Sequence, residues 1–131
     1  MMKINDAELP DDLKYNKDNS WVRVEGDMAI IGVTDLAAKQ VNEFVFINLP
    51  KKEQQVLKGN TYVSLESVKW SGHLSCPVSG KITEVNEALF DKPAKINKNP
   101  YESWIIKVKM SNKDELNDLL TAQQLAELKK G

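Results

Sequence analysis

The fold is decided by residues 59–80, which read GNTYVSLESVKWSGHLSCPVSG. Residues rich in Thr, Tyr, Val and Leu lead up to Lys69, and a second strand pattern leaves through Pro77 to Gly80, with glycine, serine and proline at the breaks. The pattern predicts two paired strands with Lys69 at the connection between them.

A lysine at an exposed hairpin tip suits a protein that carries a covalently attached group. The paired strands hold the backbone still, while the amine projects into solvent where another enzyme can reach it. Most lysines on turns are ordinary solvated charges, so Lys69 alone does not decide between these two interpretations.

The rest of the chain predicts further short strands. Residues 21–25 alternate apolar and polar side chains, Gly26 and Asp27 interrupt the pattern, and residues 28–33 resume it. Residues 44–49 and 104–110 also read as strands. The spacing predicts a mainly β fold, a small antiparallel two-sheet sandwich with short helices.

Helix signals are few and local. Thr34 is placed to cap a helix over residues 35–41, and Asn86 to cap a turn over residues 87–89. At the C-terminus, two pairs have the three-residue spacing of a capping box, which predicts two short helices: Ser111 with Asp114, and Thr121 with Gln124. Leu125 and Leu128 would share one face of the second helix.

The length and composition predict one domain. A chain of 131 residues with 41% hydrophobic content can bury one core but not two. We expect a single domain over residues 1–131, with a loose N-terminal lead-in at about residues 1–14. Pro93 and Pro100 should keep the stretch between them irregular.

Charge and cysteine content exclude several classes of protein. With 18 basic and 19 acidic residues the net charge is −1, which argues against nucleic acid as a partner. One cysteine, Cys76, rules out an internal disulfide framework and a multi-cysteine metal site. The apolar runs are too short for a membrane span, and no signal or transit peptide is visible, so we expect a cytoplasmic protein.

Five residues around the hairpin resemble the attachment motif of biotinyl and lipoyl domains, namely Gly59, Glu66, Lys69, Pro77 and Gly80. Within that superfamily, the sequence is most similar to the H protein family of the glycine cleavage system. The resemblance runs from about Tyr15 to the C-terminus and is carried by Trp21-Val22, Gly32-Val33-Thr34-Asp35, Glu66-Ser67-Val68-Lys69, Pro77-Val78-Ser79-Gly80, Val85-Asn86-Glu87-Ala88-Leu89 and Asn99-Pro100-Tyr101.

The resemblance implies a carrier subunit rather than an enzyme, with no catalytic residue of its own. Lipoic acid would be joined to Lys69 through an amide, by a lipoate ligase or an octanoyltransferase. The arm would take an aminomethyl group from the pyridoxal-phosphate glycine decarboxylase, pass it to the aminomethyltransferase, and be reoxidised by dihydrolipoamide dehydrogenase. We expect a monomer that visits these partners in turn.

The neighbours of Lys69 favour lipoate over biotin. Biotin carriers usually have methionine on both sides of the lysine, whereas this chain has Val68 and Trp70. Glu66, three residues before the lysine, resembles the recognition feature of lipoyl-attaching enzymes, although an exposed strand charge would look the same. We expect Glu66, Val68 and Trp70 to flank the site of recognition, and Trp70 to shield or stack on the arm.

Two departures from the family concern the cleft near the arm. H proteins commonly carry glutamate just before the tryptophan and aspartate four residues after the lysine, where this chain has Ser20 and His73. Because those carboxylates can hold a positively charged amine, their absence keeps two alternatives open. The first is a lipoyl carrier for another system, such as sulfur oxidation or lipoyl relay, and the second is an unmodified binding module.

The remaining chemistry-bearing residues point to packing. His73 and Cys76 are too few to complete a zinc site, and we expect no metal. Cys76 reads as a small core residue before Pro77, and Trp21, Tyr62 and Trp104 read as core aromatics.

Overall fold

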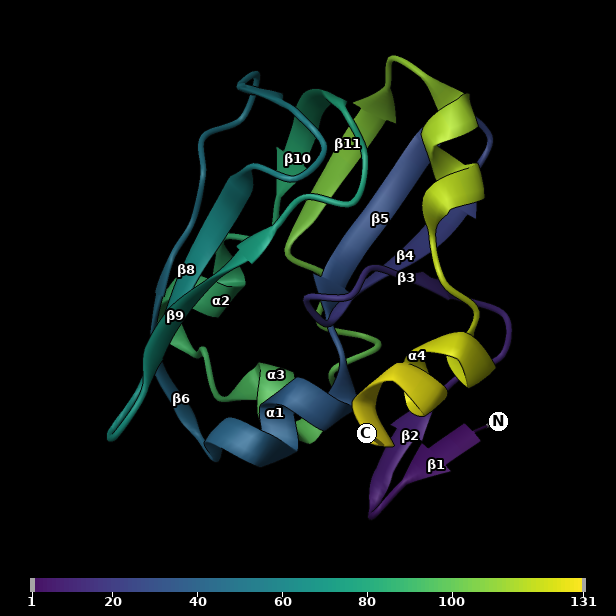
Figure 1. Ribbon diagram of the computed structural model, residues 1–131. Helices are drawn as coiled ribbons and strands as arrows, with labels where there is room; N and C mark the ends of the chain where they lie inside the picture. Colours follow the sequence, from purple (N-terminus) through teal and green to yellow (C-terminus); the bar gives the residue numbers. More distant parts are fainter. Residues whose placement is uncertain (1, 131) are drawn as a thin grey trace.

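The computed structural model describes residues 2–130, which form three antiparallel sheets and short helices (Figure 1). A six-stranded sheet has the order β3-β4-β5-β11-β10-β7, and a three-stranded sheet has the order β6-β8-β9. The strands of these two sheets are β3 Lys14–Tyr15, β4 Ser20–Glu25, β5 Met28–Val33, β6 Phe44–Asn48, β7 Gln55–Val56, β8 Thr61–Ser67, β9 Ser71–Ser75, β10 Gly80–Val85 and β11 Ile106–Met110.

The two larger sheets stand on opposite sides of one core (Figure 1). Ile31 and Val108 contribute from the six-stranded sheet, Ile47 and Leu65 contribute from the three-stranded sheet, and all four are fully buried. This arrangement confirms the prediction of a mainly β, two-sheet antiparallel fold. Burying one face of each sheet against the other supplies the main stabilisation of the fold.

Two glycines in the decisive stretch have the structural roles that their positions suggested. Gly59 has φ of +89°, in the left-handed region that favours glycine. At Gly80 a β-carbon would clash with the backbone carbonyl of Lys109 and lie 2.7 Å from Cγ1 of Val108. The pairing of β10 with β11 therefore requires glycine at residue 80.

Two of the predicted helix caps are confirmed. In α1 Asp35–Val41, the backbone N–H of Ala37 donates to Oγ1 of Thr34 at 3.2 Å. Before α4 Ala122–Lys130, Gln124 N–H donates to Oγ1 of Thr121 at 3.1 Å, and Thr121 N–H donates to Oε1 of Gln124 at 2.9 Å. These reciprocal bonds form the capping box read from the sequence.

Other helix expectations are corrected. The first C-terminal helix is a 3₁₀ helix, η1 Lys113–Asp118, and its cap is Asn112 rather than Ser111. Asn86 does not cap α2 Ala88–Asp91, because its side chain donates instead to the carbonyl of Trp104 at 2.8 Å. Leu128 is 56% exposed, so it does not share the buried face of Leu125.

Residues between the two prolines are more regular than expected. They include α3 Lys95–Lys98, which places Ile96 fully in the core. The side chain of Asn97 joins this helix to α1, since it donates to the carbonyl of Ala38 at 3.1 Å. Because these contacts are tertiary, local sequence patterns did not indicate the helix.

The N-terminal segment is also more ordered than the predicted loose lead-in. It forms a hairpin of β1 Met2–Ile4 and β2 Ala7–Leu9. Leu9, Leu13 and Tyr15 are buried in a second cluster together with Leu125 of α4. The sequence did not predict this hairpin, because the segment is mostly polar and its few apolar residues pack against a helix at the other end of the chain.

Candidate functional site

Lys69 lies at the tip of the β8–β9 hairpin, as predicted, but the returning strand is β9 and not the predicted stretch from Pro77 to Gly80, which leads into β10 of the other sheet. The turn is closed by a hydrogen bond from Ser67 N–H to the carbonyl oxygen of Trp70, with an N–O distance of 2.7 Å. Val68 and Lys69 occupy the two central positions, and both side chains are exposed. The turn projects at the end of the three-stranded sheet, at the lower left of Figure 1.

The hairpin register fixes which side chains surround the tip. Leu65 pairs with Gly72 and is fully buried, so its neighbours Glu66 and Ser71 project from the opposite face. On the other side of β8, Glu66 pairs with Phe46 of β6. Glu66 is therefore an exposed carboxylate on the outer face of the sheet, close in sequence to Lys69.

Trp70 is folded back against the sheet. Its ring lies edge-on to Phe44, with centroids 6.3 Å apart, and the side chain is 39% exposed. It also covers Gly72 closely, because a β-carbon on Gly72 would lie 2.7 Å from Cη2 of the indole. Glycine at residue 72 thus leaves the space in which the Trp70 ring packs.

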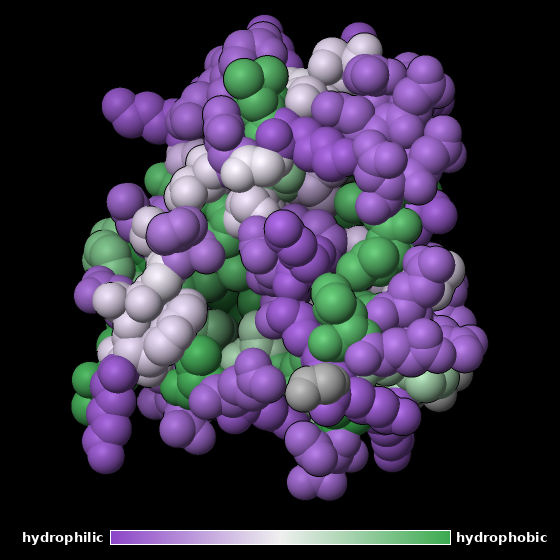
Figure 2. Space-filling view, viewed as in Figure 1, coloured by the Kyte–Doolittle hydropathy of each residue, from purple (hydrophilic) through white to green (hydrophobic). Residues whose placement is uncertain are grey.

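Two hollows lie next to each other on this side of the molecule. The first, of about 450 Å³, is beside the tip and is lined by Lys69, Trp70, Glu43 and the end of α1. The second, of about 270 Å³, has an apolar floor that includes Leu65 and Leu74. Both are bounded by Gln40, Val41 and Trp70. Figure 2 shows green apolar residues at the bottom of a hollow on this face.

We call the second hollow the cleft. Its rim is polar and carries both positive and negative charges. Lys17, Asp18, Asn19, His73 and Lys129 line it. Asp18 accepts a hydrogen bond from the hydroxyl of Ser75, and Lys129 Nζ donates to the carbonyl of Lys17 at 2.8 Å. Among the residues that line the cleft in the described chain, Asp18 is the one carboxylate.

Of the two cleft residues predicted from sequence, one is placed there. His73 lines the cleft and is exposed. Ser20 needs correction: it is fully buried, and its Oγ lies 2.9 Å from the hydroxyl of Tyr62. The preceding residue, Asn19, lines the cleft in its place and has φ of +71°.

Cys76 has the packing role that the sequence indicated. It is buried at the base of the hairpin, where its N–H donates to Asn60 and its carbonyl accepts from Gly59. Burial raises the pKa of the Cys76 thiol to about 12. A thiol with so high a pKa is a poor nucleophile at neutral pH. In the part of the chain that is described, no three His, Cys, Asp or Glu residues gather as metal ligands.

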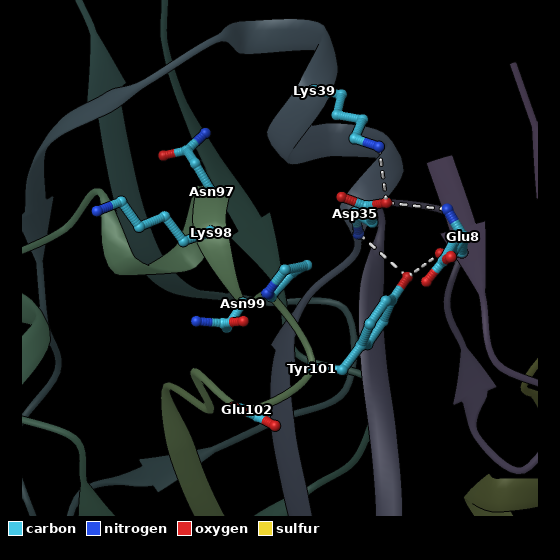
Figure 3. Close-up of a pocket in the computed structure, with 9 residues that line it drawn as sticks. Glu8, Asp35, Lys39, Asn97, Lys98, Asn99, Tyr101 and Glu102 are labelled. Atoms are coloured by element: carbon cyan, nitrogen blue, oxygen red, sulfur yellow. Dashed lines mark hydrogen bonds and ion pairs between the residues drawn. The ribbon is translucent and has the colours of Figure 1, made fainter. Parts of the chain in front are cut away.

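A separate polar pocket of about 410 Å³ is lined by residues 97–102 together with Glu8 of β2 and Asp35 and Lys39 of α1 (Figure 3). Its polar groups bond to one another: Glu8 N–H donates to Oδ2 of Asp35 at 2.9 Å, and Asp35 N–H donates to the Tyr101 hydroxyl at 3.1 Å. Lys39 Nζ lies 3.4 Å from Oδ2 of Asp35. Burial raises the pKa of the Tyr101 hydroxyl, which also donates to the carbonyl of Glu8. These bonds attach β2 to α1.

Comparison with known proteins identifies the family. Residues 13–131 match the model of the glycine cleavage H-protein family. The chain belongs to this family. It is 43% identical over 121 residues to the glycine cleavage system H protein of Staphylococcus haemolyticus, and 42% identical over 121 residues to that of Staphylococcus carnosus. Both alignments cover 92% of this chain and 96% of the relative.

A solved structure of an H protein has the same fold. The crystal structure of the glycine cleavage system H protein from Mycobacterium marinum superposes with a TM-score of 0.83 at 31% sequence identity, covering 94% of this chain and all of that one. The family match begins after β2, so it includes the Lys69 hairpin and the cleft. In residues 2–130, no helix is long and apolar enough to cross a membrane.

Proposed function

We propose that this H-protein family member is a lipoyl carrier of the glycine cleavage system, with Lys69 as the attachment point. The observation that supports this most directly is the exposed Lys69 at the tip of a two-residue turn. The strands on both sides of that turn are anchored by buried residues such as Leu65 and Leu74. The amine is therefore accessible while its backbone is held in place.

The surroundings of Lys69 fit an amide-linked arm. Within residues 2–130 no carboxylate forms an ion pair with its amine, so acylation breaks no such contact. The hollow beside the tip offers about 450 Å³ next to the side chain. Trp70 and the apolar floor of the cleft supply surface for an apolar chain.

In this proposal the lipoyl group supplies the chemistry, and the protein supplies its attachment and positioning. When bound, the lipoyl group supplies a disulfide that can be reduced, loaded with an aminomethyl group and reoxidised. The hairpin holds the point of attachment and keeps the arm at high effective concentration near each partner. The proposed partners are glycine decarboxylase, aminomethyltransferase and dihydrolipoamide dehydrogenase, and the protein itself has no catalytic role.

The attachment site can be tested by mass spectrometry. Co-expression with a lipoate ligase should add one lipoyl group to the intact protein, and peptide mapping should place that group on Lys69. Lys69→Ala should abolish the added mass, whereas the exposed Lys51→Ala should keep it. Mapping of the lipoyl group to another lysine would contradict the proposal.

One observation favours a second candidate, a lipoyl carrier with a different cargo. The rim of the cleft carries Lys17 and Lys129 beside Asp18, and His73 stands where family members commonly have aspartate. A positively charged aminomethyl amine gains less from such a rim than from two carboxylates. The same charges would suit a cargo without positive charge.

Glycine–bicarbonate exchange with a glycine decarboxylase distinguishes the two candidates. For the lipoylated protein, His73→Asp combined with Lys129→Glu should raise the exchange rate several-fold if the rim charge limits amine binding. Lys130→Glu, next to Lys129 on the same helix, is the matched charge control. Equal exchange for the wild type and the double variant would show that the rim charges are harmless and favour the aminomethyl carrier.

A further inference from the structure

The exposed apolar residues of this chain are concentrated around the arm-bearing hairpin. Eight large apolar side chains are exposed in residues 2–130, and five of them lie on β6, on α2 or at the turn. These five are Val45, Phe46, Val68, Trp70 and Phe90. Of these five, Phe46 and Phe90 are in direct contact, and exposed apolar residues that cluster in this way mark an interaction site more often than scattered single residues do.

The centre of this surface is a pair of aromatic rings. Phe46 and Phe90 pack edge to face with centroids 6.3 Å apart, and they are 43% and 59% exposed. Phe46 pairs in the sheet with Glu66, which is three residues from Lys69. We use the name aromatic patch for Phe46 and Phe90 together with two other exposed residues, Val45 next to Phe46 in β6 and Val68 at the turn.

The exposed charges near the aromatic patch include four carboxylates and two lysines, Lys69 and Lys92. Glu43, Glu66, Glu87 and Asp91 are all exposed and lie beside members of the patch in sequence or across the sheet. In residues 2–130 none of these four carboxylates belongs to an ion pair. A partner with apolar side chains surrounded by lysine or arginine would therefore be complementary to this surface.

The length of the unmodified lysine side chain indicates which partner must contact this surface. An unmodified lysine side chain is short, so an enzyme that acylates its amine must bring its active site against the turn itself. Enzymes that act on the far end of a lipoyl arm meet it well away from the backbone. The attaching enzyme must therefore contact Val68 and the sheet surface next to the turn, where Phe46 lies across from Glu66.

We propose that the aromatic patch is the docking surface for the enzyme that acylates Lys69. This inference rests on the proposed function, because it requires that Lys69 is acylated. The aromatic pair would be the apolar anchor of the interface, and the surrounding carboxylates would steer a basic enzyme surface to the turn. Glu66 would belong to that acidic rim.

The test is steady-state acylation of the unmodified protein by a lipoate ligase with lipoate and ATP. Phe46→Ser and Phe90→Ser should each raise KM for the carrier about tenfold with little change in kcat, as expected for an interface anchor. Leu57→Ser and Leu128→Ser are matched controls, because both side chains are exposed, at 60% and 56%, and lie outside the patch. Neither control should change KM.

A charge variant tests the same surface without altering the rings. Glu87→Gln combined with Asp91→Asn should raise KM at low salt and weaken the dependence of KM on ionic strength. Because both side chains are exposed, the thermal midpoint should stay near that of the wild type.

The outcomes separate this inference from the proposed function. If the wild type gains no lipoyl group on Lys69, the proposed function fails. If Lys69 is acylated but the patch variants and the two leucine controls have equal KM, only the docking surface is wrong. If sedimentation shows a dimer that Phe46→Ser dissociates, the patch binds a second copy of the chain, which also overturns the inference.

Discussion

The two ends of the β8–β9 hairpin differ in almost every physical respect. At the base, Tyr62, Cys76 and Val78 are buried, and the backbone of Cys76 bonds to Gly59 and Asn60. At the tip, Val68 is 85% exposed, and Lys69 meets solvent. The base therefore determines stability, while the tip is free to carry chemistry. One hairpin combines a rigid support with an accessible amine.

The sharpest contrast concerns thiol reactivity at the base. At pH 8, Cys76 in the folded protein should react with iodoacetamide about a thousandfold more slowly than in denaturant, because its raised pKa leaves little thiolate. The same shift should lower stability as pH rises above about 8.5, where the unfolded thiol loses its proton and the folded one does not. Alkylation followed by mass spectrometry measures the rate. Similar rates in both states would show that the base is open.

Gly80→Val should give the largest loss of stability. A side chain at this position meets the backbone of Lys109, which cannot move without disturbing β11. We expect a loss of about 3 kcal/mol, at the upper end of the range for overpacking. Thermal or urea unfolding provides the measurement. A melting temperature equal to that of the wild type would mean that β10 and β11 are less closely paired than described.

Tyr62→Phe should have an intermediate effect. The substitution keeps the ring but removes the partner of the buried Ser20 hydroxyl, whose Oγ lies 2.9 Å from the Tyr62 hydroxyl. Leaving a buried hydroxyl without a partner costs about 1–2 kcal/mol. The double variant with Ser20→Ala should recover part of this loss in urea unfolding. No recovery would indicate that the two hydroxyls do not depend on each other.

Lys69→Ala should have the smallest effect on stability while removing the proposed attachment point. Its side chain is exposed and has no ion pair within residues 2–130, so unfolding free energy should change by less than about 0.5 kcal/mol. Calorimetry on unmodified proteins is the suitable measurement. A loss comparable with that of Gly80→Val would erase the distinction between the base and the tip.

Features encoded by local sequence were predicted best. The hairpin around Lys69, the Thr34 cap and the Thr121–Gln124 capping box each depend on residues only a few positions apart. The β1–β2 hairpin was missed because its apolar residues pack against α4, from the far end of the chain. Its polar composition gave no local signal of that contact.

The cleft shows a second limit of sequence reasoning. Strand periodicity cannot decide whether Asn19 or Ser20 faces the cleft, because one residue of difference exchanges the two faces. Here the left-handed backbone at Asn19 breaks the pattern just before β4. Lys129 reaches the rim from the last helix, so its place could be known only from the tertiary structure.

β1 packs against α4 on the side of the molecule away from the β8–β9 turn, whereas Lys129 near the end of α4 lines the cleft beside that hairpin (Figure 1). An affinity tag, a fluorescent protein or a resin joined at the N-terminal end would be anchored away from the arm, whereas one joined at the C-terminal end would lie beside the cleft. Coupling to a solid support through the N-terminal end should therefore leave the turn facing the solution, which makes this fold a convenient base for immobilised carrier assays.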